Sequence, residues 1–171
     1  MRTIAILRHA KSSWGDAAAR DFDRPLDDRG RLAAERVGSE LKQRGVRFDH
    51  VLASPAIRVR QTLERLGDAY GALPEIRFDD SLYGASERHL LALIRALPGE
   101  VCAPLIVGHN PGLHSLVLTL TSDDEQGLRG RIAPKFPTAA FAAIDLPAEH
   151  WNEVELGAGR LRELILPREL D

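Results

Sequence analysis

The chain has 171 residues, a hydrophobic fraction of 44%, a charged fraction of 28% and a formal net charge of −2. This length fits one domain over residues 1–171, and the near-neutral charge excludes the strong basic field that favours nucleic acid or an anionic membrane as partner. No apolar run approaches the roughly 20 residues needed to cross a bilayer, and the single cysteine cannot form an internal disulfide. We therefore expect a soluble, cytoplasmic protein.

The first half of the chain alternates predicted strands and helices. The aliphatic run Thr3–Leu7 predicts a buried strand, and the polar segment Ala10–Asp28 that follows predicts a loop long enough to favour a functional role. Asp27 can cap a helix whose apolar stripe, Ala33, Val37 and Leu41, leads to a terminal Gly45. The next predicted elements are a strand at Val51–Ala53, a helix starting at Ser54-Pro55 with the face Val59, Leu63, Leu66 and Tyr70, and an extended piece at Ile76–Phe78.

The second half continues the alternation. Ser86 can cap a helix that carries Leu90, Ile94 and Leu97 on one side. The apolar run Leu105–Gly108 predicts a buried strand, and a Pro111-Gly112 turn leads from it into another helix, with Leu113, Leu116, Val117 and Leu120. The last predicted elements are two strands, Ala139–Leu146 and Leu161–Leu166. The pattern predicts an α/β fold, a three-layer sandwich with one mostly parallel mixed sheet flanked by helices.

Residues suited to phosphoryl transfer follow the predicted strands. In open α/β sheets ligands bind beyond the carboxyl ends of the strands, where loops and helix N-termini gather. Arg8 and Arg58 can each clamp phosphate oxygens with a planar, permanently charged fork. A neutral imidazole can attack phosphorus if its other nitrogen donates to a backbone carbonyl, and His9 has that opportunity. We assign His109 to donate to the phosphoryl oxygens as charge develops on them.

Four motifs in sequence order resemble the histidine phosphatase superfamily, and in particular its SixA-type phosphohistidine phosphatase branch. The resemblance runs from residue 4 to about 145 and rests on LRHAKSSW (Leu7–Trp14), DRPLDDRG (Asp23–Gly30), SPAIRVRQT (Ser54–Thr62) and GHNP (Gly108–Pro111). It implies a phosphoglycerate-mutase-like fold with a catalytic phosphate pocket formed by Arg8, His9, Arg58 and His109, and it implies that His9 carries the phosphoryl group. By the same resemblance, Ser12 is expected to contact the substrate phosphate, and Lys11 and Tyr83 are further candidate substrate-binding residues.

The chain departs from the superfamily pattern at two places. Ala10 stands where many relatives have glycine, a change that is tolerable if the backbone there does not need a positive φ. Where the mutases have a carboxylate as general acid, the region Asp79–Gly84 offers Tyr83, and the SixA-type branch is similar in lacking an obvious acid. An imidazole leaving from phosphohistidine needs less help than an alkoxide, which favours phosphohistidine in a protein as substrate.

Other interpretations remain open at this point. The chain could be a small-molecule phosphomonoesterase or phosphomutase of the same fold, or a non-catalytic phosphate-binding module. His114 could suggest a metal site with His9, but no His-x-x-x-His pair or cysteine cluster accompanies them, and we expect no metal or organic cofactor. The cations Arg129, Arg131 and Lys135 predict a solvated loop that could also contact an acidic phosphoprotein.

Overall fold

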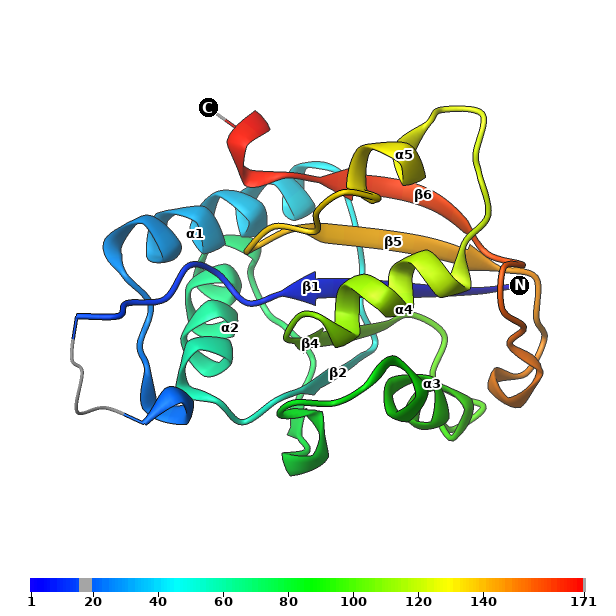
Figure 1. Ribbon diagram of the computed structural model, residues 1–171, viewed down its shortest axis with the longest axis horizontal. Coiled ribbons are helices and arrows are strands. Elements are labelled where there is room, and N and C mark those ends of the chain that lie inside the picture. The colour runs from blue at the N-terminus through cyan, green and yellow to red at the C-terminus, as the bar shows by residue number, and fades with distance from the viewer. Residues whose placement is uncertain (16–19, 171) are drawn as a thin grey trace.

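A six-stranded sheet with the order β3-β2-β4-β1-β5-β6 forms the middle of the molecule (Figure 1). The computed structural model describes residues 1–15 and 20–170. The first four strands in this order are parallel, whereas β5 is antiparallel to β1 and β6 is antiparallel to β5. The predicted mixed, mostly parallel sheet is therefore confirmed. The strands are β1 (Arg2–Arg8), β2 (His50–Ala53), β3 (Ile76–Phe78), β4 (Pro104–Gly108), β5 (Phe141–Leu146) and β6 (Arg160–Ile165).

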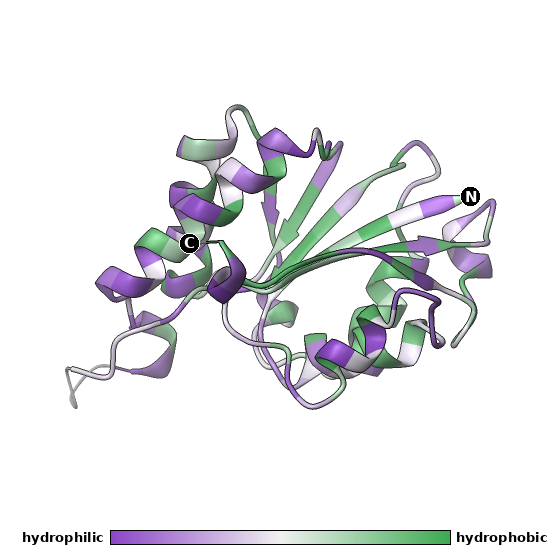
Figure 2. Cartoon of the chain, turned by 90° about the horizontal axis from the view of Figure 1, so that it is seen from above, coloured by the Kyte–Doolittle hydropathy of each residue, from purple (hydrophilic) through white to green (hydrophobic). Residues whose placement is uncertain are grey.

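Helices cover both faces of the sheet, and Figure 2 shows the largely hydrophobic strands between them. Neighbouring residues of a strand point to opposite faces. In β1, Ala5 and Leu7 therefore pack against α1 (Asp28–Gln43) and α2 (Ile57–Tyr70), while Ile4 and Ile6 pack on the side of α3 (Glu87–Arg95), α4 (Gly112–Leu120) and the short α5 (Leu128–Ile132). The predicted three-layer sandwich is confirmed.

Local signals at the helix ends are confirmed as well. The Asp27 carboxylate accepts a hydrogen bond from the Gly30 N–H at 2.8 Å, and the Ser86 hydroxyl accepts one from the His89 N–H at 3.2 Å. Gly45 has a φ of 68°, the left-handed conformation that glycine adopts at helix C-termini without steric cost. Of the residues expected on the α3 face, Leu97 lies beyond the helix, which ends at Arg95.

Three predicted boundaries are wrong in detail. The helix expected to start at Ser54-Pro55 begins at Ile57, so these two residues belong to the turn at the end of β2. The strand expected from Ala139 begins at Phe141, because Ala139 has a φ of 60°, which a strand cannot accommodate. The loop expected around Arg129, Arg131 and Lys135 contains most of α5, which ends at Ile132. None of the helices in the described part of the chain combines the length and apolar character needed to cross a membrane.

Candidate active site

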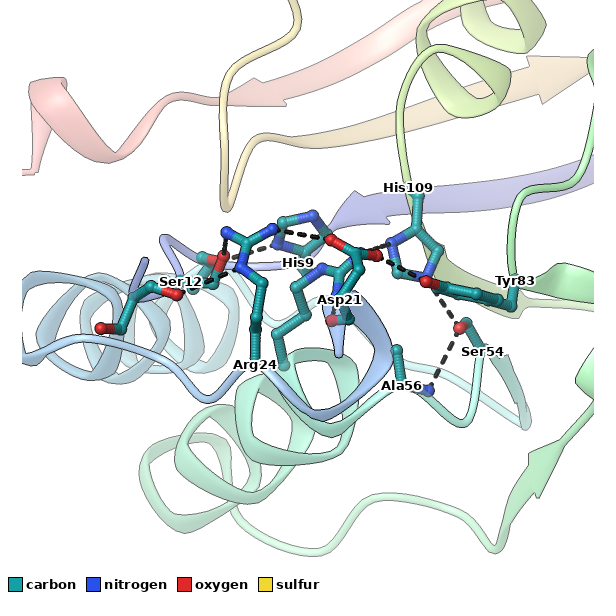
Figure 3. A network of polar contacts seen from close by, with 11 residues as sticks. His9, Ser12, Asp21, Arg24, Ser54, Ala56, Tyr83 and His109 are labelled. Atoms are coloured by element: carbon teal, nitrogen blue, oxygen red, sulfur yellow. Dashed lines mark hydrogen bonds and ion pairs between the residues drawn. The ribbon is translucent and has the colours of Figure 1, made fainter. Parts of the chain in front are cut away.

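Three parallel strands deliver the predicted site residues to one end of the sheet. Arg8 is the last residue of β1, and it pairs in register with Gly108, the last residue of β4. The residues that follow are His9 and His109, and the His9 N–H donates to the Gly108 carbonyl at 3.1 Å. The two imidazole rings consequently approach each other, with their centroids 5.2 Å apart (Figure 3).

A cavity of about 440 Å³ opens at this point. It brings together six of the seven residues predicted for the site. Tyr83 is not among the lining residues, but its ring centroid lies 5.4 Å from that of His109. The lining residues are Arg8, His9, Lys11, Ser12, Trp14, Asp21, Arg24, Arg58, His109, Asn110 and Thr138.

The tautomer of His9 follows from its partner. Its Nδ1 lies 2.7 Å from the Ala10 carbonyl oxygen, which can only accept, so Nδ1 carries the proton. The Nε2 atom has no hydrogen-bond partner among the described residues, and its lone pair is available for attack. Ala10 does not have a positive φ, which explains why a side chain is tolerated where many relatives of the superfamily have glycine.

Burial keeps His9 neutral. The residue is only 7% exposed, and the loss of hydration lowers the pKa of His9 to about 3 against the opposing effect of the Ala10 carbonyl. Repulsion from a protonated His109 and from the charges of Arg58 and Arg8 lowers that pKa further. The neutral form, which is the nucleophilic form, is therefore present at every physiological pH.

His109 is held at both ring nitrogens. The Arg58 guanidinium donates from Nη2 to Nδ1 at 3.3 Å, so Nε2 carries the proton and donates to the Ser54 hydroxyl oxygen at 2.7 Å. Burial, and then the charge of Arg58, lower the pKa of His109 to about 4. In this arrangement neither ring nitrogen has a free proton to donate into the cavity. From the sequence we expect His109 to donate directly to the phosphoryl oxygens, which the ring cannot do in this state.

Asp21, which sequence reasoning did not select, joins the central residues of the site. It lies in η1 (Asp21–Asp23), a single turn inside the long loop after β1. Its backbone carbonyl accepts from Arg58 Nη1 at 2.7 Å, and its Oδ2 accepts from Arg58 Nη2 at 3.1 Å and from the Tyr83 hydroxyl at 2.5 Å. The hydrogen bond from Tyr83, followed by those from Arg24 and Arg58, holds the pKa of Asp21 well below its usual range. The same contact raises the pKa of Tyr83.

Arg24 is a second residue that the sequence analysis did not assign. It is 8% exposed, and it donates to Asp21 Oδ1 at 2.9 Å and to the Ser12 hydroxyl (Figure 3). Its guanidinium also lies over the Trp14 ring, 3.2 Å from the ring centroid. The sequence already indicates that this loop is unusually long. Charged residues inside such a loop are the signal that could have identified Asp21 and Arg24.

A buried threonine ties the loop after β1 to α2. The Thr62 hydroxyl is fully buried, accepts from the Ala10 N–H at 2.9 Å and donates to the Arg58 carbonyl at 2.6 Å. The backbone beside His9 is thereby fixed relative to the helix that carries Arg58.

The electrostatic character of the cavity is strongly cationic. Four permanently charged side chains line it, Arg8, Lys11, Arg24 and Arg58, and Asp21 is the only carboxylate among the described lining residues. Burial, and then the charge of Arg58, lower the pKa of Arg8. The Nε–H groups of Arg8 and Arg58 are buried without a hydrogen-bond partner among the described residues, an arrangement that an anion can relieve.

His114 takes no part in this arrangement. Its Nε2 lies 2.8 Å from the Ile132 carbonyl oxygen, and its ring stacks on Phe136 with the centroids 6.4 Å apart. Within residues 1–15 and 20–170, no group of three or more histidine, cysteine or carboxylate side chains is arranged to hold a metal ion.

Comparison with known proteins agrees with this architecture. Residues 4–85 match the family model of the histidine phosphatase superfamily (branch 1). An uncharacterised protein of Mycobacterium tuberculosis is 37% identical over 95% of this chain and 100% of its own length. The phosphohistidine phosphatase SixA of Escherichia coli is 32% identical over 84% of each chain. A solved structure of the protein histidine phosphatase SixA complexed with tungstate superimposes with a TM-score of 0.80 at 28% identity, covering 99% of each chain.

The chain belongs to the histidine phosphatase superfamily. Its sheet and helices have the phosphoglycerate-mutase-like arrangement, and both its sequence and its fold are similar to those of SixA-type phosphohistidine phosphatases.

Proposed function

We propose that residues 1–171 form one phosphatase domain that removes phosphoryl groups from phosphohistidine in cytoplasmic proteins through a phosphorylated His9. The observation that carries this proposal is the state of His9: its Nδ1 proton is held by the Ala10 carbonyl and its Nε2 lone pair is free. Similarity to proteins named phosphohistidine phosphatase supports the substrate class.

In the first step, the Nε2 lone pair of His9 forms a bond to phosphorus while the bond from phosphorus to the substrate imidazole breaks. Arg8 and Arg58 neutralise the non-bridging oxygens, as required when phosphoryl transfer depends on positioning and charge stabilisation. When the distal nitrogen of the substrate ring carries a proton, the leaving group departs as neutral imidazole. The phosphorylated His9 then has the same protonation state that the substrate had.

The proton donors of the site favour this leaving group. Asp21 is held ionised, and the proton of Tyr83 is directed to Asp21 while the pKa of Tyr83 is raised. An alkoxide would need a proton delivered to the bridging oxygen as its bond to phosphorus breaks, and neither group is set to deliver one. A phosphohistidine substrate brings the required proton on its own ring.

In the second step, water attacks phosphorus and the bond to His9 Nε2 breaks, which regenerates the neutral ring and releases dihydrogen phosphate. His109 supports both steps in our proposal. A dianionic phosphoryl group beside its Nδ1 raises the pKa of His109 from about 4, and the protonated ring can donate from Nδ1 while Ser54 keeps Nε2 in place. We further propose that Ser12 and Lys11 contact the phosphoryl oxygens from the cavity wall.

A substrate comparison tests the proposal. The kcat/KM for a phosphohistidine peptide should exceed that for an alkyl phosphate monoester at equal pH by at least about a hundredfold. A general acid typically contributes a factor of this size, and only the alkyl substrate needs one. The variant His9→Asn should lose both activities. Equal or greater efficiency on alkyl monoesters would favour the phosphomonoesterase alternative instead.

A further inference from the structure

A basic groove adjoins the catalytic cavity. It has a volume of about 750 Å³ and is lined by six cationic side chains and by no carboxylate among the described residues. This segregation stands out in a chain with 23 basic and 25 acidic residues and a net charge of −2. The cations are Arg8, Lys11, Arg29, Arg131, Lys135 and Arg168, and the remaining lining residues are Pro134, Pro137, Thr138, Leu166 and Pro167.

Four of these six cations have no hydrogen-bond or ion-pair partner for their side chains among the described residues. Lys11, Arg29, Lys135 and Arg168 are exposed and make no hydrogen bond or ion pair through their side chains with the described part of the protein. Only Arg131 forms an ion pair, with Glu169. Cations that already had partners would have to give them up to bind an anion, whereas these four would not.

The groove is continuous with the active site. Arg8, Lys11 and Thr138 line both the groove and the catalytic cavity. The other walls come from the first turn of α1, from α5 and the segment between α5 and β5, and from Leu166 and the C-terminal turn η4 (Pro167–Glu169). Figure 1 shows these segments at the end of the sheet to which β1 points. When the phosphoryl group of a substrate lies at His9, the residues next to the phosphohistidine therefore reach the groove.

We propose that this basic groove docks an acidic segment of the phosphoprotein substrate next to its phosphohistidine. The inference rests on the proposed function and deepens it, because it names the charge of the sequence that flanks the modified residue. The proline side chains between the cations, Pro134, Pro137 and Pro167, provide apolar contact for a peptide backbone and for the stems of glutamate side chains. Long-range attraction also raises the rate of encounter with acidic partners.

The distribution of the cations favours an extended segment over a small polyanion. The groove is larger than the catalytic cavity of about 440 Å³, and its unpaired cations stand on separate chain segments. All four are exposed, so they suit an adaptable, solvated contact along a chain. A compact polyanion would be expected to bind buried, convergent donors such as those around His9.

Two matched peptides test the inference. Both carry one phosphohistidine in the same sequence, but one is flanked by glutamates and the other by glutamines. We expect the parent protein to favour the glutamate peptide by about tenfold in kcat/KM at low ionic strength, the size expected for a few exposed ion pairs. The double variant Lys135→Ala/Arg168→Ala, which leaves the catalytic cavity intact, should lose most of that preference and keep its rate on the glutamine peptide.

The matched control is Lys42→Ala/Arg47→Ala. It removes the same charge at the opposite end of the sheet, from exposed residues without hydrogen-bond or ion-pair partners in the described chain. This control should keep the full preference. Salt at about 0.5 M should abolish the preference of the parent protein, because exposed charges are then screened within a few ångströms.

The outcomes separate the docking inference from the proposed function. Equal rates on the two peptides in the parent protein, or an unchanged preference in the groove variant, would overturn docking and leave the function standing. A nucleoside diphosphate could instead inhibit the parent protein and inhibit the Lys135→Ala/Arg168→Ala variant more weakly, while the two peptides react equally well. That result would assign the groove to small polyanions and would also overturn peptide docking. If neither peptide is hydrolysed, the proposed function fails, and binding of the two peptides to His9→Asn still measures docking.

Discussion

Replacing His9 should change how the stability of the protein depends on pH. Burial lowers the pKa of His9 from its usual 6.5 to about 3, so between these values the unfolded chain binds a proton at this residue and the folded protein does not. Stability therefore rises with pH across this window and is lost as the pH falls below about 6.5, at up to about 1.4 kcal/mol per pH unit. Between about pH 7.5 and pH 5 the loss due to His9 alone amounts to ~2 kcal/mol.

The variant His9→Asn removes this titration and leaves a polar side chain of similar size. Urea unfolding at the two pH values should show a loss of stability that is smaller by ~2 kcal/mol in the variant than in the parent protein. His150→Asn makes the same substitution at an exposed position and serves as the matched control for the change of residue type. The same pH dependence in His9→Asn and in the parent would refute the assignment of His9 as a buried, neutral ring.

Three further substitutions test the residues that surround and position His9. Asp21→Asn removes the only described carboxylate of the cavity, so inhibition by inorganic phosphate should strengthen by about fivefold, and steady-state kinetics that show weaker inhibition would contradict this. Thr62→Val leaves the buried Ala10 N–H without its hydrogen-bond partner and should cost ~1–3 kcal/mol in urea unfolding, more than Thr121→Val, whose hydroxyl only donates to the Val117 carbonyl. Gly30→Ala would place a Cβ 2.0 Å from the Lys11 carbonyl oxygen, so it should cost ~1–3 kcal/mol and reduce kcat/KM; a variant with the parent's melting curve and rate would show that this contact is unimportant.

The sequence contained enough information for the sheet and for the two histidines. Buried parallel strands are continuous apolar runs, and β1 and β4 are each followed directly by a histidine, so the meeting of His9 and His109 follows from strand direction. The caps at Asp27 and Ser86 depend only on residues three positions away and could be predicted for that reason.

The contacts of Asp21 could not be predicted in the same way. Asp21 meets Arg58 and Tyr83 across separations of 37 and 62 residues, from a single turn without any hydrophobic periodicity. The roles of the two nitrogens of His109 depend on Arg58 and Ser54, which lie on other elements. Such long-range polar geometry leaves no local pattern in a single sequence.

The basic groove was only partly foreseen. The charges of Arg131 and Lys135 were visible in the sequence, and their contact with an acidic phosphoprotein was one interpretation of them. Arg29 and Arg168 lie in other parts of the chain, and only the fold brings them to the same groove. Clusters of charge assembled from distant segments need the tertiary structure to be recognised.

The phosphoryl group on His9 is the central claim, and a rapid-quench experiment measures it most directly. The protein is mixed with a phosphohistidine peptide, quenched in alkali within one turnover, digested and analysed by mass spectrometry. We predict an acid-labile phosphoryl group on the peptide that contains His9, absent from His9→Asn. Phosphate release at the parent rate by His9→Asn, or a phosphoryl group on another residue, would contradict the account.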